Sequence, residues 1–375
     1  MTDCDFLIIG AGMAGASAGY ELAHHGRVVV LEREEHPGYH STGRSAAVFS
    51  ESYGNAAVRA ITSAGRAFYE APPPGFAEAP LMTPRGFLFI ARADQDDSLR
   101  ALLEDAESTA TPVQWLTAAE AVARVPVLDP GYVAAAVLEA DAMDMDVHAI
   151  HQGYLRGLRA RGGQIVPRAE VAGMAYADGA WQVETHAGRF AAPVVVNAAG
   201  AWADEVARLA GVRPVGLVPK RRTAFVFDPP DGLDIEAWPV VVDVDEAFYF
   251  KPDAGRVLGS PADETPVPPQ DVQPEDWDIA VGADRIEKAT TMTIRRIERK
   301  WAGLRSFVAD KTPVVGFAPY ATGFLWLAGQ GGYGIQTAAG MARIAAALAR
   351  GQPLPADIAA RGVTEHDLAP DRLWM

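Results

Sequence analysis

The chain begins with two short apolar runs separated by a segment of helical composition. Residues 5–10 form the first run, residues 14–25 the helical segment, and residues 27–32 the second run. Continuous apolar runs, rather than alternating ones, are typical of strands that are buried on both faces of a parallel sheet. The N-terminal segment therefore predicts a β-α-β unit at the start of a doubly wound sheet.

Two later apolar runs end in small residues and predict strands of the same kind. They cover residues 193–200 and 323–328, and a segment of helical composition follows at residues 337–350. Residues 215–260 instead alternate strand-like runs with proline and glycine, which is typical of an antiparallel sheet. We therefore predict an α/β fold in which a Rossmann-like domain is joined to an α+β domain on a mixed or antiparallel sheet.

The composition indicates a folded protein that does not bind nucleic acid. Of the 375 residues, 49% are hydrophobic, and 33 basic against 48 acidic residues give a formal charge of −15. Because nucleic-acid binding needs a basic surface, we exclude a nucleic-acid partner. The one cysteine, Cys4, excludes an internal disulfide framework and suits a reducing cytoplasm.

We expect neither a targeting segment nor a membrane span. The apolar run at residues 6–9 is too short for a signal peptide. A membrane-spanning helix would need a stretch of about 18 uninterrupted apolar residues, which we do not find. We expect a cytoplasmic protein, and peripheral contact with a membrane stays open.

A glycine-rich turn follows the first predicted strand and opens the first predicted helix. It reads GAGMAG and spans Gly10, Ala11, Gly12, Met13, Ala14 and Gly15. Such glycines allow a tight turn, let a pyrophosphate approach the backbone and permit close packing of helix on strand. Glu32 lies 22 residues after Gly10, where a carboxylate can accept hydrogen bonds from ribose hydroxyls. This context predicts a dinucleotide site, which would also include Arg33.

Two further segments favour FAD over a nicotinamide dinucleotide. Soon after Glu32 the chain supplies hydroxyls, a cation and small residues at Ser41, Thr42, Arg44, Ser45, Ala46 and Ala47. The glycine-rich residues 329–336 lie between a predicted strand and a predicted helix. The amides and dipole of a helix N-terminus suit the anionic pyrimidine edge of a reduced flavin. We therefore predict FAD as the cofactor.

Several segments together resemble the D-amino-acid oxidase superfamily of flavoproteins, which includes glycine and sarcosine oxidases. They are residues 10–15, 197–202, 301–305 and 329–336. Residues 40–47, 219–222, 248–252 and 331–336 resemble its D-arginine dehydrogenase branch, and the likeness runs nearly end to end. The resemblance implies that FAD is bound non-covalently. It also implies cofactor contacts at Val171, Ala199, Gly200, Trp202, Gly303, Gly331, Gly332, Tyr333, Gly334, Ile335 and Gln336.

A substrate carboxylate needs a fixed cation, and two arginines are candidates. Arg222 and Arg305 could each offer a planar fork of donors, although a surface ion pair is the alternative for either. In the family that the chain resembles, two arginines and a tyrosine hold the carboxylate. The resemblance therefore implies this role for Arg222, Arg305 and Tyr249.

The resemblance also implies how the rest of the substrate is held and oxidised. The backbone carbonyl of Gly332 would orient the α-amine, and Tyr53 would close over the site on a mobile loop. Hydride transfer from Cα to flavin N5 would leave an imino acid, which hydrolyses to a 2-oxo acid and ammonia.

Two departures from the arginine-preferring members concern the substrate side chain. Those members have a glutamate where this chain has Phe87, and a histidine where it has Val48. A guanidinium would have to lose water against an apolar wall, which is costly. We therefore predict a pocket for neutral, apolar or aromatic D-amino acids, lined also by Ser50 and Gln336; the alternative is that Phe87 is a core residue that faces away.

The predicted function is that of an FAD-dependent D-amino-acid dehydrogenase, with a quinone or a respiratory component as electron acceptor. One alternative is an oxidase or dehydrogenase of secondary amines, such as sarcosine or opine-like amino acids. Another is a flavin-binding electron-transfer subunit with little activity alone. We predict no metal site. Asp141, Asp144 and Asp146 lie near His148 and His151, but these acids are interpreted as solvated residues at a helix start, with Asp146 as the N-cap.

Cofactor and substrate segments alternate along the chain, so the predicted domains are discontinuous. We expect an FAD-binding domain of residues 1–78, 143–208 and 306–375. The substrate-binding domain would then comprise residues 79–142 and 209–305.

Overall fold

The computed structural model describes residues 2–107 and 112–374, and its first layer is a six-stranded sheet. The strand order is β10-β3-β2-β14-β22-β21, parallel throughout except for β21, which is antiparallel to β22. In chain order the strands are β2 (Phe6–Ile9), β3 (Val28–Leu31), β10 (Gln164–Val166), β14 (Val194–Asn197), β21 (Val314–Phe317) and β22 (Phe324–Ala328). The two N-terminal apolar runs are thus neighbouring parallel strands, as predicted.

Helices cover one face of this sheet. Ile8, Val30 and Leu325 point into a core that also contains Leu158 and Ile344 from the covering helices. These helices are α1 (Met13–Leu22), α5 (Val147–Ala160) and α8 (Ala338–Ala349), with α2 (Ala56–Glu70) packed outside α8. A four-stranded sheet and α6 (Ala203–Leu209) cover the other face; its strands are β1 (Thr2–Asp3), β13 (Gly188–Ala192), β12 (Ala180–Thr185) and β11 (Val171–Ala177).

The second large layer is a nine-stranded mixed sheet. Its order is β19-β15-β18-β17-β16-β6-β8-β7, and β20 pairs with β15. The strands are β6 (Phe87–Ala91), β7 (Val113–Thr117), β8 (Ala135–Glu139), β15 (Val218–Phe227), β16 (Val240–Asp243), β17 (Tyr249–Asp253), β18 (Arg256–Ser260), β19 (Thr265–Pro266) and β20 (Arg299–Phe307). All neighbours are antiparallel except β16 and β6, so the predicted mixed sheet is confirmed.

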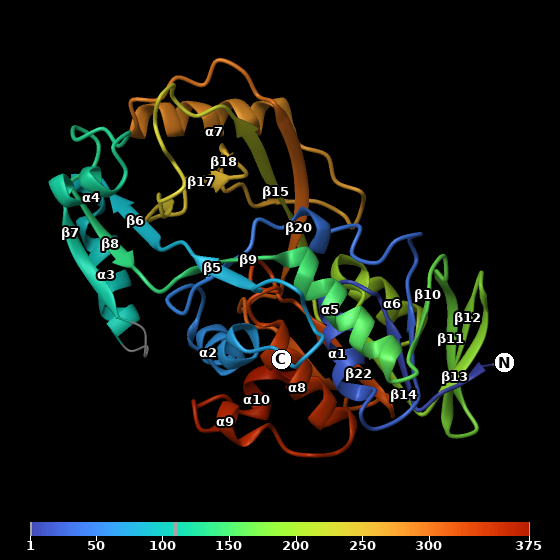
Figure 1. Cartoon of the computed structure of the whole chain (residues 1–375). Helices are drawn as coiled ribbons and strands as arrows, with labels where there is room; N and C mark the ends of the chain where they lie inside the picture. The colour runs from blue at the N-terminus through green and yellow to red at the C-terminus, as the bar shows by residue number, and fades with distance from the viewer. Residues whose placement is uncertain (1, 108–111, 375) are drawn as a thin grey trace.

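Three helices flank this second sheet: α3 (Asp96–Glu107), α4 (Ala118–Arg124) and α7 (Asp276–Ala289). Figure 1 shows α7 along the outer side of β15, β17 and β18, away from the six-stranded layer. A small sheet of β4 (Val48–Phe49), β9 (Met143–Met145) and β5 (Met82–Pro84) lies where the chain passes between the two layers (Figure 1). The C-terminus adds the short helices α9 (Ala356–Ala359) and α10 (Glu365–Leu368).

Across the residues described, no helix is long and apolar enough to cross a membrane.

Candidate active site

A cavity of about 340 Å³ extends from the glycine turn of the six-stranded sheet to the inner face of the nine-stranded sheet. All but three of the residues predicted for the cofactor and substrate sites line it. The exceptions are Ala11, Gly15 and Tyr333. Segments that are distant in sequence therefore meet around one continuous space.

The glycine turn has the tight backbone geometry and the close helix packing that its glycines predict. Gly10 has a φ of +100°, and a Cβ there would lie 2.5 Å from the carbonyl oxygen of Ala198. A Cβ on Gly15 would lie 1.9 Å from the carbonyl oxygen of Gly10, so α1 can pack this closely on the turn only with glycine. The amide of Met13, in the first turn of α1, donates to Thr42 Oγ1 at 2.9 Å.

Glu32 joins the ends of the first two strands. Its carboxylate accepts hydrogen bonds from the amides of Ala11 at 3.0 Å and Glu34 at 2.9 Å. Burial raises the pKa of Glu32. Since the side chain also lines the cavity, its remaining acceptor capacity faces the space where a ribose would lie.

A half-buried histidine, His40, supports the fit of a dinucleotide. His40 lines the cavity, and its Nε2 lies 2.9 Å from Glu34 Oε1. Its Nδ1 is buried and has no hydrogen-bond partner among the described residues. Nearby, Arg33 stacks over the ring of Trp202 at 4.8 Å from its centroid. A buried ring nitrogen without a partner suits a polar ligand at this place.

Arg44 lines the cavity, and its guanidinium also bonds several protein groups. Its guanidinium donates to the carbonyl oxygens of Val272 at 2.9 Å and Ala302 at 3.0 Å, and it pairs with Asp271. Its own carbonyl accepts from Trp301 Nε1 at 3.0 Å. Arg44 thus ties the segment after the glycine turn to β20 and its neighbouring loop.

Two arginines from adjacent antiparallel strands converge on the cavity. Arg222 lies on β15 and Arg305 on β20, and both line the cavity. Arg305 Nη1 donates to the hydroxyl of Tyr53 at 3.3 Å, and Arg222 Nη2 donates to Glu264 Oε1 at 3.2 Å. Arg222 Nε is buried without a partner among the described residues. Burial and then the like charge of Arg305 lower the pKa of Arg222, so an anion between the two would be favourable.

The C-terminal glycine loop lies directly against this pair. A Cβ on Gly332 would come within 2.7 Å of Arg305 Nη1, and one on Gly331 within 2.1 Å of the Phe307 ring. Glycine at both positions therefore lets the backbone that precedes α8 approach the arginines. This places Gly332 beside the guanidinium of Arg305.

One wall of the cavity is apolar and contains Phe87. The ring of Phe87 lies 6.0 Å from the ring of Tyr53 and 4.8 Å from that of Phe89, measured between centroids. Val48, Val240 and Val242 belong to the same wall. The alternative in which Phe87 faces away from the cavity is therefore wrong.

Sequence reasoning missed an acidic residue in this site, Glu246. It lies in the turn between β16 and β17, has a φ of +55°, and its Oε2 accepts from the hydroxyl of Tyr53 at 3.3 Å. Three acids within four residues are typical of a solvated turn, so no local pattern indicated the cavity.

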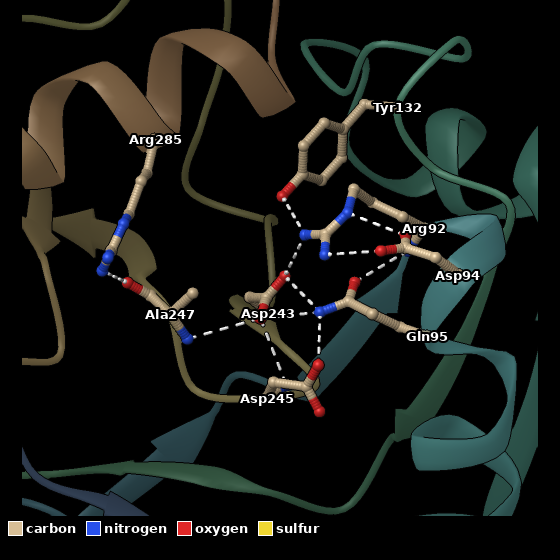
Figure 2. A network of polar contacts seen from close by, with 8 residues as sticks. All are labelled: Arg92, Asp94, Gln95, Tyr132, Asp243, Asp245, Ala247 and Arg285. Carbon is tan, nitrogen blue, oxygen red and sulfur yellow. Dashed lines mark hydrogen bonds and ion pairs between the residues drawn. The ribbon is translucent and has the colours of Figure 1, made fainter.

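A network of polar contacts fixes the turn that carries Glu246 (Figure 2). Asp243 Oδ1 accepts from the amides of Asp245 at 3.1 Å and Ala247 at 3.3 Å, and from Gln95 Nε2 at 3.2 Å. Arg285 donates to the carbonyl of Ala247 at 2.6 Å from the side of α7. The turn is therefore held from both sides just before Tyr249.

The predicted helix cap at Asp146 is present, but two of its neighbours are not solvated. Asp146 Oδ1 accepts from the amide of Ala149 at 2.8 Å at the start of α5. Asp144 instead bonds Lys251 Nζ and Arg85 Nε, both at 2.6 Å. His151 is buried, and its Nε2 lies 2.9 Å from the carbonyl oxygen of Ala11 under the glycine turn. These contacts correct the interpretation of Asp144 as a solvated acid.

The chain is similar in sequence to several oxidoreductases. The chain is 25% identical to the uncharacterized oxidoreductase YurR of Bacillus subtilis, over 97% of each chain. It is 29% identical to mouse mitochondrial sarcosine dehydrogenase, over 45% of this chain and 20% of that protein. Bovine FAD-dependent oxidoreductase domain-containing protein 1 is also 29% identical, and the chain spans 35% of its length.

Solved structures of the same fold cover nearly the whole chain. L-proline dehydrogenase from P. horikoshii matches with a TM-score of 0.86 and 21% identity, over 100% of this chain and 98% of that one. Glycine oxidase from Geobacillus kaustophilus matches with a TM-score of 0.82 and 21% identity, over 98% and 100%.

The sequence model of the DAO family, described as "FAD dependent oxidoreductase", matches residues 5–348. With the glycine turn, the buried carboxylate after the second strand and the continuous cavity, the match assigns FAD as the cofactor. The chain is a member of the DAO family of FAD-dependent oxidoreductases.

Proposed function

We propose that this chain is an FAD-dependent dehydrogenase of D-amino acids with neutral, apolar or aromatic side chains. One observation carries the proposal: Arg222 and Arg305 converge on the cavity next to Gly332, and the same cavity has an apolar wall built around Phe87. Two cations and an apolar wall suit a ligand that has a carboxylate at one end and an apolar group at the other.

The residues of the chain would bind and orient such a substrate. Arg222, Arg305 and Tyr249 would hold the carboxylate, each charge-assisted hydrogen bond contributing about 1.5–3 kcal/mol. The carbonyl of Gly332 would accept a hydrogen bond from the α-amine. Tyr53, which already contacts Arg305, would cover the bound substrate and exclude water.

Bound FAD supplies a two-electron acceptor for the hydride of the substrate Cα–H bond. The substrate leaves as an imino acid, and addition of water to its C=N bond yields the 2-oxo acid and ammonia. The electrons would pass on to a quinone or a respiratory component.

The wall around Phe87 supports the preference for uncharged side chains. Phe87, Val48, Val240 and Val242 offer no partner for a guanidinium or an ammonium group. Burying an unpaired cation there costs several kcal/mol. Glu246, one of the acids that line the cavity, contacts Tyr53, whose hydroxyl also accepts from Arg305.

A second candidate is the oxidation of secondary amines. It is favoured by the relatives, because sarcosine and L-proline, named for two of them, carry secondary amines. Such an enzyme would use the same carboxylate site and differ at the amine. A flavin-binding subunit with little activity alone is disfavoured, because it would not need two arginines in a buried cavity.

The test mixes the holoenzyme without oxygen with D-amino acids, L-amino acids and N-methyl amino acids, and follows the absorbance of oxidised flavin. We expect rapid reduction by D-leucine, D-methionine and D-phenylalanine and slow reduction by D-arginine. Reduction by N-methyl amino acids alone would establish the second candidate. Comparing turnover in air with turnover on a quinone distinguishes an oxidase from a dehydrogenase.

A further inference from the structure

Glu139 is a fully buried carboxylate that the proposed reaction does not use. It is the last residue of β8, and its side chain has an exposure of 0%. Its Oε2 accepts from the hydroxyl of Ser50 at 2.6 Å and from the hydroxyl of Ser52, and its Oε1 accepts from the amide of Glu51 at 2.8 Å. Three donors from consecutive residues therefore meet on one carboxylate.

Burying this acid is costly, and no cation offsets the cost. Burial raises the pKa of Glu139, while the hydrogen bonds from Ser50 and Ser52 act against that rise. In the part of the chain that the structure describes, no lysine, arginine or histidine forms an ion pair with it. The cost of burying an ionisable group is offset by its hydrogen bonds. All three hydrogen bonds of Glu139 come from residues 50–52, so the carboxylate holds this segment.

Residues 50–52 form the base of the loop that carries Tyr53. The loop connects β4, which ends at Phe49, to α2, which begins at Ala56. On its far side, the carbonyl of Gly54 accepts from Arg59 Nη1 at 2.9 Å. Tyr53 lies between these two attachments in the chain, and its ring is 6.0 Å from that of Phe87 and 5.1 Å from that of Tyr333, measured between centroids.

The anchor comes from the sheet that builds the substrate wall. Glu139 pairs directly with Phe87 across the antiparallel strands β8 and β6. The residue that holds the base of the loop and the residue that forms the wall are thus cross-strand neighbours. Any shift of this sheet would carry the base of the Tyr53 loop with the wall.

We propose that Glu139 is a positioning residue that fixes Tyr53 over the substrate by holding residues 50–52. This inference rests on the proposed function, because Tyr53 is assigned there as the cover of the bound substrate. A carboxylate suits this task since both of its oxygens accept and neither donates. The amide of Glu139→Gln keeps the shape but turns one acceptor into a donor that faces the loop.

The test measures substrate dissociation constants and limiting rates of flavin reduction without oxygen. The set comprises the wild type, E139Q, Y53A and the double variant. We expect E139Q to weaken D-leucine binding about 10-fold, since a hydrogen bond to a charged group is worth about 1.5–3 kcal/mol. The limiting rate should change less than about 3-fold. In the Y53A background the effect on binding should shrink below about 2-fold, because the positioned residue is gone.

Two results would overturn the proposal: wild-type binding by E139Q, or an equal loss of binding in both backgrounds. E120Q, at an exposed helix cap on α4, is the matched control and should bind D-leucine as the wild type does. FAD content and the unfolding temperature are measured for every variant. If E139Q does not fold, S52A removes one donor and should weaken binding in the same direction by a smaller factor.

Hydrogen–deuterium exchange separates failure of this inference from failure of the proposed function. If no D-amino acid reduces the wild-type flavin, the proposed function fails, but the anchor can still be examined. Peptides that cover residues 50–54 should then exchange faster in E139Q than in the wild type. Equal exchange would show that Glu139 does not hold the loop.

Discussion

Two consecutive arginines of β15, Arg221 and Arg222, point to opposite faces of the strand and have different surroundings. Arg222 lines the cavity together with Arg305, whose like charge helps to lower the pKa of Arg222. Arg221 points to the other face of β15, where it pairs with Glu275 and Asp278. Alternation along a strand therefore places one arginine at the substrate and the next in an acidic cluster.

This contrast leads to a prediction on substrate binding. Arg222→Lys keeps a positive charge but loses the planar fork, and it should raise the dissociation constant of a D-amino acid between about 10-fold and 100-fold. Flavin absorbance titrations without oxygen measure it. Arg221→Lys is the control and should leave the dissociation constant near the wild-type value. Equal effects of the two substitutions would contradict the assignment.

A second prediction concerns the side-chain wall. Phe87→Glu places a carboxylate in the apolar wall, so kcat/KM for D-arginine should rise at least about 10-fold while that for D-phenylalanine falls. Steady-state assays with both substrates test the change of preference. Phe87→Leu keeps the wall apolar and should retain the wild-type order. A Phe87→Glu enzyme that still prefers D-phenylalanine would show that another part of the cavity selects the side chain.

At the scale of elements, the turn into α1 decides whether the cofactor binds. A Cβ at Gly12 would lie 3.3 Å from Thr42 Oγ1, on the side from which a pyrophosphate would approach. Gly12→Val should therefore weaken FAD binding at least about 10-fold, measured by titrating apoprotein with FAD. Gly173→Val on β11, where a Cβ meets nothing within 4 Å, is the control and should bind FAD normally. Unchanged FAD affinity in Gly12→Val would place the pyrophosphate elsewhere.

Elements with strong local patterns could be predicted from the sequence, and elements that depend on distant partners could not. The strands Phe6–Ile9 and Val28–Leu31 and the turn between them follow from apolar runs and glycine spacing. The two- and three-residue strands of the small sheet are too short to show a period. The parallel pairing of β16 with β6 joins segments about 150 residues apart, which no local pattern records.

The same distinction holds for the candidate site. Many cofactor residues lie in the two glycine-rich segments, whose spacing has a physical meaning. The other cofactor residues and the roles of the substrate residues followed from a family resemblance. Glu246 and Glu139 were missed because an acid in a turn and an acid at a strand end both look solvated in a sequence. Only the packing of distant segments places one beside Tyr53 and the other beneath its loop.

At the scale of the whole molecule, Asp144 connects the small sheet with the nine-stranded sheet. It lies on β9 and bonds Lys251 of β17 and Arg85, all three with side chains less than one-fifth exposed. Asp144→Asn should lower the free energy of unfolding by about 3 kcal/mol, because it leaves a buried lysine without its counter-charge. Urea unfolding of the holoenzyme measures the loss.

The control for this prediction is an exposed ion pair. Asp284→Asn breaks the pair with Lys288 on α7, where both side chains are more than half exposed. Such pairs contribute less than about 1 kcal/mol, so this variant should unfold nearly as the wild type does. If Asp144→Asn were no more destabilising than Asp284→Asn, Asp144 would not be needed to join the sheets.

The division into two discontinuous domains stays a prediction, and limited proteolysis at residues 79 and 306 would examine it.

The most direct test of the whole account is the anaerobic reduction of the holoenzyme by the two enantiomers of leucine. The amine and the side chain exchange places between the enantiomers when the carboxylate is held by the same arginines. We predict that D-leucine bleaches the flavin absorbance to completion at a rate that saturates with concentration, while L-leucine at equal concentration leaves it oxidised. Reduction by L-leucine with oxidised flavin remaining in D-leucine would contradict it.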